Sequence, residues 1–301
     1  MGFDGIILLN KKYGISSNTA INDIKWALKR QGKDVKKVGH AGTLDPNATG
    51  LLVVLVNGAT KLSDFLMLEN KEYQAEITIG KSYDTEDVWG NLIDEYQINE
   101  DEYQEIVNNI DQVLKNLIGV SKQIPPMYSS IKYHGRKLYE LAREGEQVDL
   151  SSKEREIEIL NLDRISDVKF IDGTVVFSIK CLVSKGTYIR TLAKKIGECL
   201  GFPSAMSALV RLSSGDYKLE NSIDIEDVKI GKYQMETMLS SLKNIRIFNA
   251  NLTVKDRCFH GKQVRLDGVK EDEVAISYQG ELIAIYERDH DNIYKAKRVW
   301  N

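Results

Sequence analysis

Apolar residues along the chain follow two patterns, one typical of strands and one typical of helices. Short apolar or alternating runs predict strands at residues 5–10, 51–56, 71–80 and 174–181. Apolar residues at helical spacing predict helices at residues 17–31, 101–117 and 187–200. Strands and helices do not alternate regularly, so the pattern predicts an α+β domain with a mixed, largely antiparallel sheet.

The pattern changes after about residue 241, where short strands are separated by turns that contain glycine. These strands are predicted at residues 251–254, 263–266, 273–278 and 281–286. A chain of 301 residues is long enough for one large and one small domain. We therefore expect a larger domain at residues 1–240 and a small β domain at residues 241–301.

Two absences limit where the protein works and what holds it together. No apolar run approaches the roughly 18–20 residues that a membrane-spanning helix needs, and the N-terminus lacks the pattern of a signal peptide, so we expect a cytoplasmic location and no membrane partner. The three cysteines are far apart and form no Cys-x-x-Cys pair. This spacing argues against disulfides and against a structural zinc site.

Charges are segregated along the chain although the net charge is only −3. Residues 25–37 carry six bases and one acid, residues 122–143 carry five bases and one acid, and residues 180–195 carry five bases and no acid. Residues 82–105 carry nine acids and no Lys or Arg. One basic run alone is typical of a solvated face, but several together favour contact with a polyanion such as a nucleic acid.

The segment most informative about chemistry is the loop Gly-His-Ala-Gly-Thr-Leu-Asp-Pro-Asn-Ala-Thr-Gly at residues 39–50. Its glycines allow positive φ angles, and Pro46 keeps Asp45 out of the helical region. A rigid loop beside a buried strand is a suitable mount for a reactive carboxylate. Spacing alone nevertheless favours a second reading, in which Asp45 only bonds its own turn.

Other catalytic templates are missing from the sequence. It contains no P-loop, no Gly-x-Ser-x-Gly elbow and no His-Glu-x-x-His pair. Its four histidines are scattered singly, which suggests neither a metal site nor a Ser-His-Asp system. A carboxylate with tyrosines and arginines remains.

Five blocks in a fixed order make the pattern specific. Besides the loop at 39–50 they are residues 10–18, residues 71–75 (Lys-Glu-Tyr-Gln-Ala), residues 124–132 (Ile-Pro-Pro-Met-Tyr-Ser-Ser-Ile-Lys) and residues 184–192 (Ser-Lys-Gly-Thr-Tyr-Ile-Arg-Thr-Leu). Together they resemble the TruB family of tRNA pseudouridine synthases over roughly residues 5–215. The resemblance implies the pseudouridine synthase fold.

The resemblance also implies roles for individual residues. Asp45 matches the nucleophile that breaks the glycosidic bond of uridine, and Arg190 matches the partner that favours its charged form. Tyr73 matches a tyrosine that stacks on the target base and takes part in proton transfer, and Tyr188 matches one that contacts the nucleotide. Leu209 matches an apolar position of the base pocket.

The remaining matches concern RNA. His40 matches a histidine that helps to accept the flipped uridine. The insertion at about residues 122–152 matches an RNA clasp, and residues 241–301 resemble a PUA-like module that grips the acceptor stem. The expected RNA-binding side chains are Tyr128, Lys132, Arg136, Lys137 and Lys185. The acidic stretch at 82–105 is expected to lie away from the RNA face.

The implied activity is isomerisation of uridine to pseudouridine at position 55, in the T-loop of tRNA, with no metal, no organic cofactor and no obligate protein partner, in a monomer. Two alternatives stay open: a tRNA-folding chaperone in which catalysis is secondary, and an enzyme of free nucleotides that uses the loop at 39–50 as an anion cradle. The chaperone would not depend on Asp45. The nucleotide enzyme would not share the steep salt dependence of RNA binding.

Overall fold

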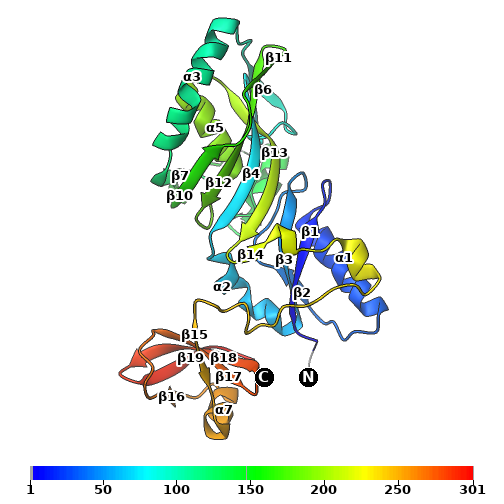
Figure 1. Ribbon diagram of the computed structural model, residues 1–301, viewed down its shortest axis with the longest axis vertical. Coiled ribbons are helices and arrows are strands. Elements are labelled where there is room, and N and C mark those ends of the chain that lie inside the picture. Colours follow the sequence, from blue (N-terminus) through cyan, green and yellow to red (C-terminus); the bar gives the residue numbers. More distant parts are fainter. Residues whose placement is uncertain (1–2, 147, 301) are drawn as a thin grey trace.

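The computed structural model describes residues 3–146 and 148–300, and it is elongated (Figure 1). A long twisted sheet extends through the upper and middle parts of the view, and a smaller, separate sheet forms the lower end. The N- and C-terminal ends of the chain both lie near this smaller sheet.

The main sheet has ten strands, most of them antiparallel. Its path runs through β1 (Gly5–Lys11), β3 (Thr49–Val56), β13 (Ser204–Ser214), β4 (Lys71–Ile79), β12 (Thr174–Val183), β10 (Arg155–Arg164) and β7 (Gly119–Gln123). Off this path, β2 (Val38–His40), β14 (Tyr217–Lys218) and β11 (Lys169–Ile171) pair with β3, β13 and β12. Because β13 and β3 are parallel and the other pairs are antiparallel, the predicted mixed, largely antiparallel α+β fold is confirmed.

Helices pack on the main sheet and enclose its core. They are α1 (Ser17–Arg30), α2 (Ser63–Met67), α3 (Glu100–Asn116), α5 (Ile189–Leu200) and α6 (Ile225–Lys229). One apolar cluster joins the inner faces of α3 and α5 to strands β4, β10, β12 and β13, and another joins α1 to β1 and β3. The three predicted helices are confirmed, although α5 starts at Ile189 because the preceding Tyr188 is still extended.

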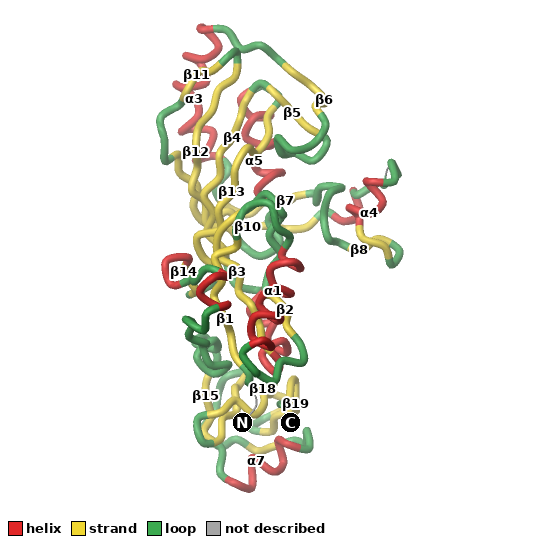
Figure 2. Tube along the Cα trace, turned by 90° about the vertical axis from the view of Figure 1, so that its right-hand side faces the viewer, coloured by secondary structure: helices red, strands yellow, loops and turns green. Residues whose placement is uncertain are grey.

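Two hairpins extend from the main sheet. The first is formed by β5 (Lys81–Tyr83) and β6 (Leu92–Glu95). The second belongs to the insertion and contains β8 (Lys132–Tyr133), β9 (Arg136–Lys137) and α4 (Leu138–Arg143). Leu138, Leu141 and Leu150 give the insertion a small apolar core of its own. The insertion therefore projects from the body as a separate arm (Figure 2).

The C-terminal sheet has five strands in the order β15 (Arg246–Asn249), β17 (Glu273–Tyr278), β18 (Glu281–His290), β19 (Ile293–Val299) and β16 (Val264–Arg265). The strand predicted at 251–254 is wrong. Those residues begin helix α7 (Leu252–Phe259), because the side chain of Asn251 accepts a hydrogen bond from the Val254 N–H and caps the helix. Within the described part of the chain, no helix is both long and apolar enough to cross a membrane.

Specific contacts dock the C-terminal sheet on the main domain. Trp300 Nε1 donates to the carbonyl oxygen of Gly58 at 2.8 Å, and Arg298 pairs with Asp64 at 3.1 Å. Leu282 and Ile285 share an apolar cluster with side chains of the main domain. The first residue of the smaller domain stays a prediction.

Candidate active site

The loop that carries Asp45 is fixed from several sides. Ser17, at the start of α1, donates its hydroxyl proton to the Leu44 carbonyl and accepts from the Leu44 N–H, both at 2.9 Å. Gly50 has a φ of +100°, and a Cβ there would lie 2.4 Å from the carbonyl oxygen of Arg211. Only glycine fits this position. Asp45 is therefore held by its neighbours, while its own side chain remains 42% exposed.

Three buried cations lie beneath this loop. Lys11 donates to the carbonyl oxygen of Pro46 at 3.1 Å, and Arg211 donates to those of Leu51 at 2.7 Å and Gly42 at 3.0 Å. Burial lowers the pKa of Lys11 to about 8, against the opposing effect of the Asp45 carboxylate. Burial and the charge of Arg211 lower the pKa of Lys71 to about 8. Lys11 and Arg211 therefore donate to backbone carbonyls in and next to this loop, whereas Lys71 donates to those of Met67 and Glu69.

Arg190 is the partner of Asp45. Its Nη2 lies 3.0 Å from Asp45 Oδ2, and its side chain is only 5% exposed. The same guanidinium donates to the carbonyl oxygens of Thr85 at 3.0 Å and Tyr128 at 2.9 Å. The buried guanidinium, fixed by these two carbonyls, orients the Asp45 carboxylate through the ion pair.

Asp87 forms the other side of the Arg190 site. Its Oδ2 lies 3.8 Å from Arg190 Nε, and it accepts hydrogen bonds from the Thr85 hydroxyl at 2.6 Å and the Trp89 N–H at 3.2 Å. Burial raises the pKa of Asp87, against the opposing effects of the Thr85 hydrogen bond and Arg190. Thr85 and Asp87, in the first part of the acidic stretch, therefore lie against Arg190, while the expectation that the stretch lies away from the RNA face stays a prediction.

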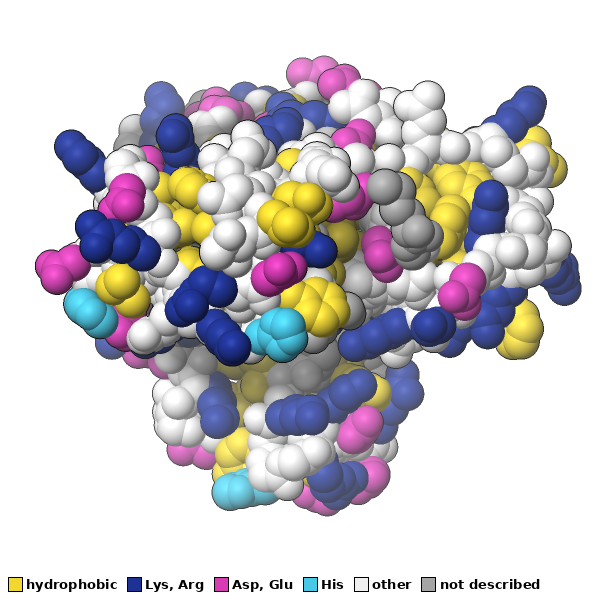
Figure 3. Space-filling model, turned by 90° about the horizontal axis from the view of Figure 1, so that it is seen from below, with side chains coloured by type: hydrophobic (Ala, Val, Ile, Leu, Met, Phe, Trp, Pro, Cys, Tyr) yellow, Lys and Arg dark blue, Asp and Glu magenta, His cyan; other side chains and the backbone are white. Residues whose placement is uncertain are grey.

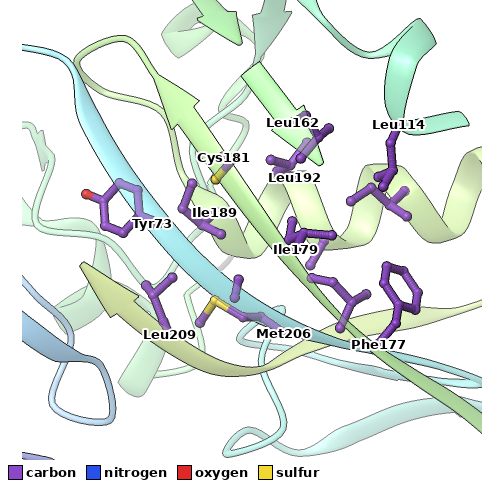
Figure 4. Close-up of a cluster of buried hydrophobic side chains, with 14 of the residues drawn as sticks. Tyr73, Leu114, Leu162, Phe177, Ile179, Cys181, Ile189, Leu192, Met206 and Leu209 are labelled. Atoms are coloured by element: carbon purple, nitrogen blue, oxygen red, sulfur yellow. The ribbon is translucent and has the colours of Figure 1, made fainter. Parts of the chain in front are cut away.

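An apolar cluster lies next to these charges, because it contains Leu44 and Ile189, the chain neighbours of Asp45 and Arg190. Tyr73 on β4 and Leu209 on β13 belong to one cluster with Ile189, and Tyr73 is 8% exposed. Figure 4 shows Tyr73 and Leu209 at one end of this cluster, with the Tyr73 hydroxyl pointing away from the apolar side chains. The arrangement offers an aromatic side chain and an apolar side chain to a planar ligand.

Tyr188 is positioned by a reciprocal pair of hydrogen bonds. The Gln123 amide donates to the Tyr188 carbonyl oxygen at 3.1 Å and accepts from the Tyr188 N–H at 2.8 Å. The guanidinium of Arg155 lies 5.3 Å above the Tyr188 ring. Because Gln123 ends β7, where the insertion begins, this contact joins the base of the insertion to the start of α5.

His40 has a buried ring nitrogen without a hydrogen-bond partner among the described residues, and its role toward the uridine stays a prediction. It lies on β2, half-buried, and burial and the charge of Arg211 lower its pKa. Its Nδ1 is buried without a hydrogen-bond partner among the described residues. Neither a hydrogen bond nor an ion pair joins His40 to Asp45 within residues 3–146 and 148–300.

The predicted RNA-binding residues are spread over two regions. Lys132, Arg136 and Lys137 lie on the hairpin of the insertion, whereas Lys185 is exposed in the turn before α5. Tyr128 lies between the regions, with its hydroxyl 3.4 Å from Asp84. In the lower part of Figure 3, Lys and Arg side chains are numerous, and several Asp and Glu side chains lie among them.

Comparison with known proteins identifies a matching family and relatives that cover the full length of the chain. Residues 29–189 match the family described as TruB family pseudouridylate synthase, N-terminal domain. A protein of Staphylococcus epidermidis named tRNA pseudouridine synthase B is 38% identical over 99% of this chain and all of its own length. A Staphylococcus aureus protein of the same name is 35% identical with the same coverage. The chain belongs to the TruB family.

Solved structures support the fold of this TruB-family chain. An H/ACA RNP bound to a substrate RNA containing 2′-deoxyuridine contains a chain with a TM-score of 0.66 and 22% identity, over 99% of this chain and 85% of that one. A Cbf5-Nop10-Gar1 complex gives a TM-score of 0.66 and 23% identity, over 98% and 84%. At this identity the likeness concerns the fold alone.

Some residues of this TruB-type site could be predicted from the sequence, and others could not. Asp45, Arg190, Tyr73 and Leu209 were predicted, and the structure brings Asp45 to Arg190 and Tyr73 to Leu209. Asp87 and Gln123 were missed, because neither differs in pattern from its polar neighbours. Lys11 was also missed, although a cation at the end of an apolar strand is a pattern from which it could have been predicted.

Proposed function

We propose that this chain isomerises uridine to pseudouridine in the T-loop of tRNA, at position 55, with Asp45 as its nucleophile. The observation that carries the proposal is the ion pair between exposed Asp45 and buried Arg190 beside the apolar cluster that contains Tyr73 and Leu209. The close relatives named tRNA pseudouridine synthase B support tRNA as the substrate. The enzyme class follows from the family.

The reaction requires one bond to break and another to form. The bond between N1 of uracil and C1′ of ribose is cleaved, the base rotates, and C5 bonds to C1′ in its place. C5 loses a proton and N1 gains one, so the product is an isomer of the substrate. In our proposal the ionised carboxylate of Asp45 attacks as the nucleophile, and the bond that it forms to the base or to the sugar is broken again by the time pseudouridine is released.

Each neighbouring side chain has a defined task in this proposal. Arg190 holds the Asp45 carboxylate in position, and Tyr73 and Leu209 hold the uracil ring. Tyr73 also takes part in proton transfer, and Tyr188 and His40 contact the flipped nucleotide. A base–aromatic contact is worth about 1–3 kcal/mol, which offsets much of the cost of extruding a base.

The wider surface is proposed to bind the rest of the tRNA. The insertion at 122–152 clasps the T-arm, and residues 241–301 act as a PUA-like domain on the acceptor stem, with residues 1–240 as the catalytic domain. We further propose that the protein works as a monomer in the cytoplasm, where tRNA is its partner. Light scattering of the purified protein with and without tRNA measures the oligomeric state.

Asp45→Asn tests the catalytic part of the proposal. The variant keeps the shape of the side chain but removes its charge, so it should bind tRNA and form no pseudouridine. Filter binding and pseudouridine mapping on the same RNA measure the two properties separately. Normal turnover by Asp45→Asn would show that another residue is the nucleophile.

A further inference from the structure

Two exposed aromatic side chains meet at the edge of the proposed active site. Tyr13 follows β1, and Trp89 lies in the loop between β5 and β6. Their ring centroids are 6.2 Å apart and their planes are tilted by 53°. Tyr13 is 58% exposed and Trp89 is 36% exposed, so the two rings touch while part of each stays open to solvent.

The two loops are anchored to the Asp45 site from opposite sides. The N–H of Gly14, next to Tyr13, donates to the carbonyl oxygen of Pro46 at 2.9 Å. The N–H of Trp89 donates to Asp87, which faces Arg190. The aromatic pair therefore bridges the loop beside Asp45 and the loop beside Arg190.

Fold stability alone does not account for this pair. A tilted aromatic contact stabilises a fold by about 0.5–1.5 kcal/mol in addition to the effect of the area that it buries. Full burial of the two rings would stabilise the fold more. Yet neither Tyr13 nor Trp89 belongs to an apolar cluster of the described residues. Two large aromatic rings left open side by side at a site indicate a surface that a ligand covers.

The charges around the pair define which part of a nucleotide fits. Asp84, Glu86 and Asp87 precede Trp89 in the same loop. Lys12, beside Tyr13, is already paired with Asp224 at 2.8 Å. The nearby cations Lys194 and Arg190 are paired as well, with Glu86 and with Asp87 and Asp45, so a phosphate would gain little here, whereas the neutral face of a base needs no cation. The geometry therefore favours a base over a backbone contact.

We propose that Tyr13 and Trp89 form a stacking platform for an unpaired base of the substrate RNA next to the target uridine. This rests on the proposed function, since the uridine itself occupies the pocket at Asp45, Tyr73 and Leu209. Unpaired loop bases are recognised by stacking on aromatic side chains. The platform holds one such base while the target uridine is extruded.

Tryptophan fluorescence measures the contact directly. The chain has three tryptophans, so Trp26→Phe/Trp300→Phe leaves Trp89 as the only reporter. An unmodified T-arm stem-loop RNA should quench this emission at saturation, because a stacked base quenches an indole. The matched control, Trp89→Phe/Trp300→Phe, reports from Trp26 on α1 and should change less. Unchanged Trp89 emission with saturating RNA would overturn the platform.

Substitutions separate stacking from plain apolar contact. Trp89→Leu and Tyr13→Leu keep apolar bulk but lose the aromatic face, while Trp89→Phe and Tyr13→Phe keep it. Each Leu variant should weaken binding of the stem-loop by on the order of 5- to 150-fold. The slope of log affinity against log salt should not change, because no phosphate contact is lost. The kcat at saturating RNA should also stay unchanged. The Phe variants should stay near wild type.

The outcomes distinguish this inference from the proposed function. If the wild-type protein forms pseudouridine and Trp89→Leu binds as tightly as Trp89→Phe, the platform is refuted and the proposed function stands. If the wild-type protein binds the RNA and forms no pseudouridine, the proposed function fails. Urea unfolding of each variant identifies any loss of affinity that comes from a loss of fold.

Discussion

At the scale of single residues, Asp45 is held in place by Ser17, Lys11 and Arg190. Ser17 holds Leu44 by two hydrogen bonds, Lys11 binds the Pro46 carbonyl, and Arg190 binds the carboxylate itself. Asp45, the proposed nucleophile, is thus supported on both sides along the chain and at its carboxylate. Such support limits the motion of the reacting group before substrate arrives.

Ser17→Ala tests this support. The substitution leaves a buried N–H and a buried carbonyl of Leu44 unpaired, which should lower the free energy of unfolding by about 1–3 kcal/mol for each group left unsatisfied. Because Asp45 follows Leu44, kcat should also fall. Denaturant unfolding and turnover of a T-arm RNA measure both effects.

Ser16→Ala is the matched control. Ser16 caps α1 by accepting from the Thr19 N–H, and its loss should cost about 1 kcal/mol of stability without moving the Asp45 loop. If Ser17→Ala lowered stability but left kcat equal to that of Ser16→Ala, the positioning role of Ser17 would be wrong.

Lys71 predicts a pH dependence of stability. Its pKa is lowered to about 8 in the folded protein, from 10.5, so between these values the unfolded chain binds more protons than the folded one. Stability therefore rises with pH in this window. The free energy of unfolding of the wild type, relative to Lys71→Met, should be higher at pH 10 than at pH 7.5. An equal difference at both pH values would contradict a lowered pKa.

At the scale of elements, the first residues of the insertion contact the start of α5, which carries Arg190. Gln123 at the end of β7 grips the Tyr188 backbone, and Arg190 donates to the Tyr128 carbonyl. A displacement of the arm would therefore act on the residues at the start of α5. RNA held by the arm and the geometry at Asp45 are connected by these contacts.

Gln123→Ala should break this connection. Removing the amide leaves the N–H and carbonyl of Tyr188 without their partner, so we expect a lower kcat together with weaker discrimination between folded and unfolded T-arms. Steady-state kinetics on wild-type and mispaired stem-loops measure both properties. Lys122→Ala, at the exposed neighbour paired with Glu154, serves as control. Equal kinetics for the two variants would rule out a special role of Gln123.

The cations of the insertion should differ in their contribution to RNA binding. Arg136 is already paired with Glu144 at 2.5 Å and with Glu146 at 3.3 Å, whereas Lys137 lies over the Tyr139 ring. Lys132→Ala and Lys137→Ala should each reduce the slope of log affinity against log salt by about 0.7–0.9, and Arg136→Ala should reduce it less. Titrations at several salt concentrations measure the slopes. A larger loss for Arg136→Ala would contradict this ranking.

Elements were easier to predict from the sequence than the contacts between them. Periodicity located α1, α3, α5 and the buried strands, because each buries one continuous face. It failed at residues 251–254, where the cap at Asn251 begins a helix in a segment that reads as a short strand. Periodicity could not indicate that residues 84–87 fold back toward Arg190, because the polar side chains of a loop follow no periodic pattern.

At the scale of the whole molecule, the parts proposed to bind tRNA lie along one elongated body. The arm projects from its middle and the C-terminal sheet forms one end (Figures 1 and 2). Trp300 and the apolar side chains of Leu282 and Ile285 fix this sheet to the main domain. The family blocks predicted membership of the TruB family, which is confirmed, while the contacts of the C-terminal sheet depend on single side chains that the sequence did not single out.

Pseudouridine mapping on an unmodified tRNA transcript tests the central claim most directly. The transcript is incubated with wild-type protein or with Asp45→Asn, treated with carbodiimide and copied by reverse transcriptase. The account predicts a stop at the T-loop uridine with the wild type and no stop with Asp45→Asn, although both bind the RNA. A wild-type reaction without that stop, or an equal stop with Asp45→Asn, would contradict it.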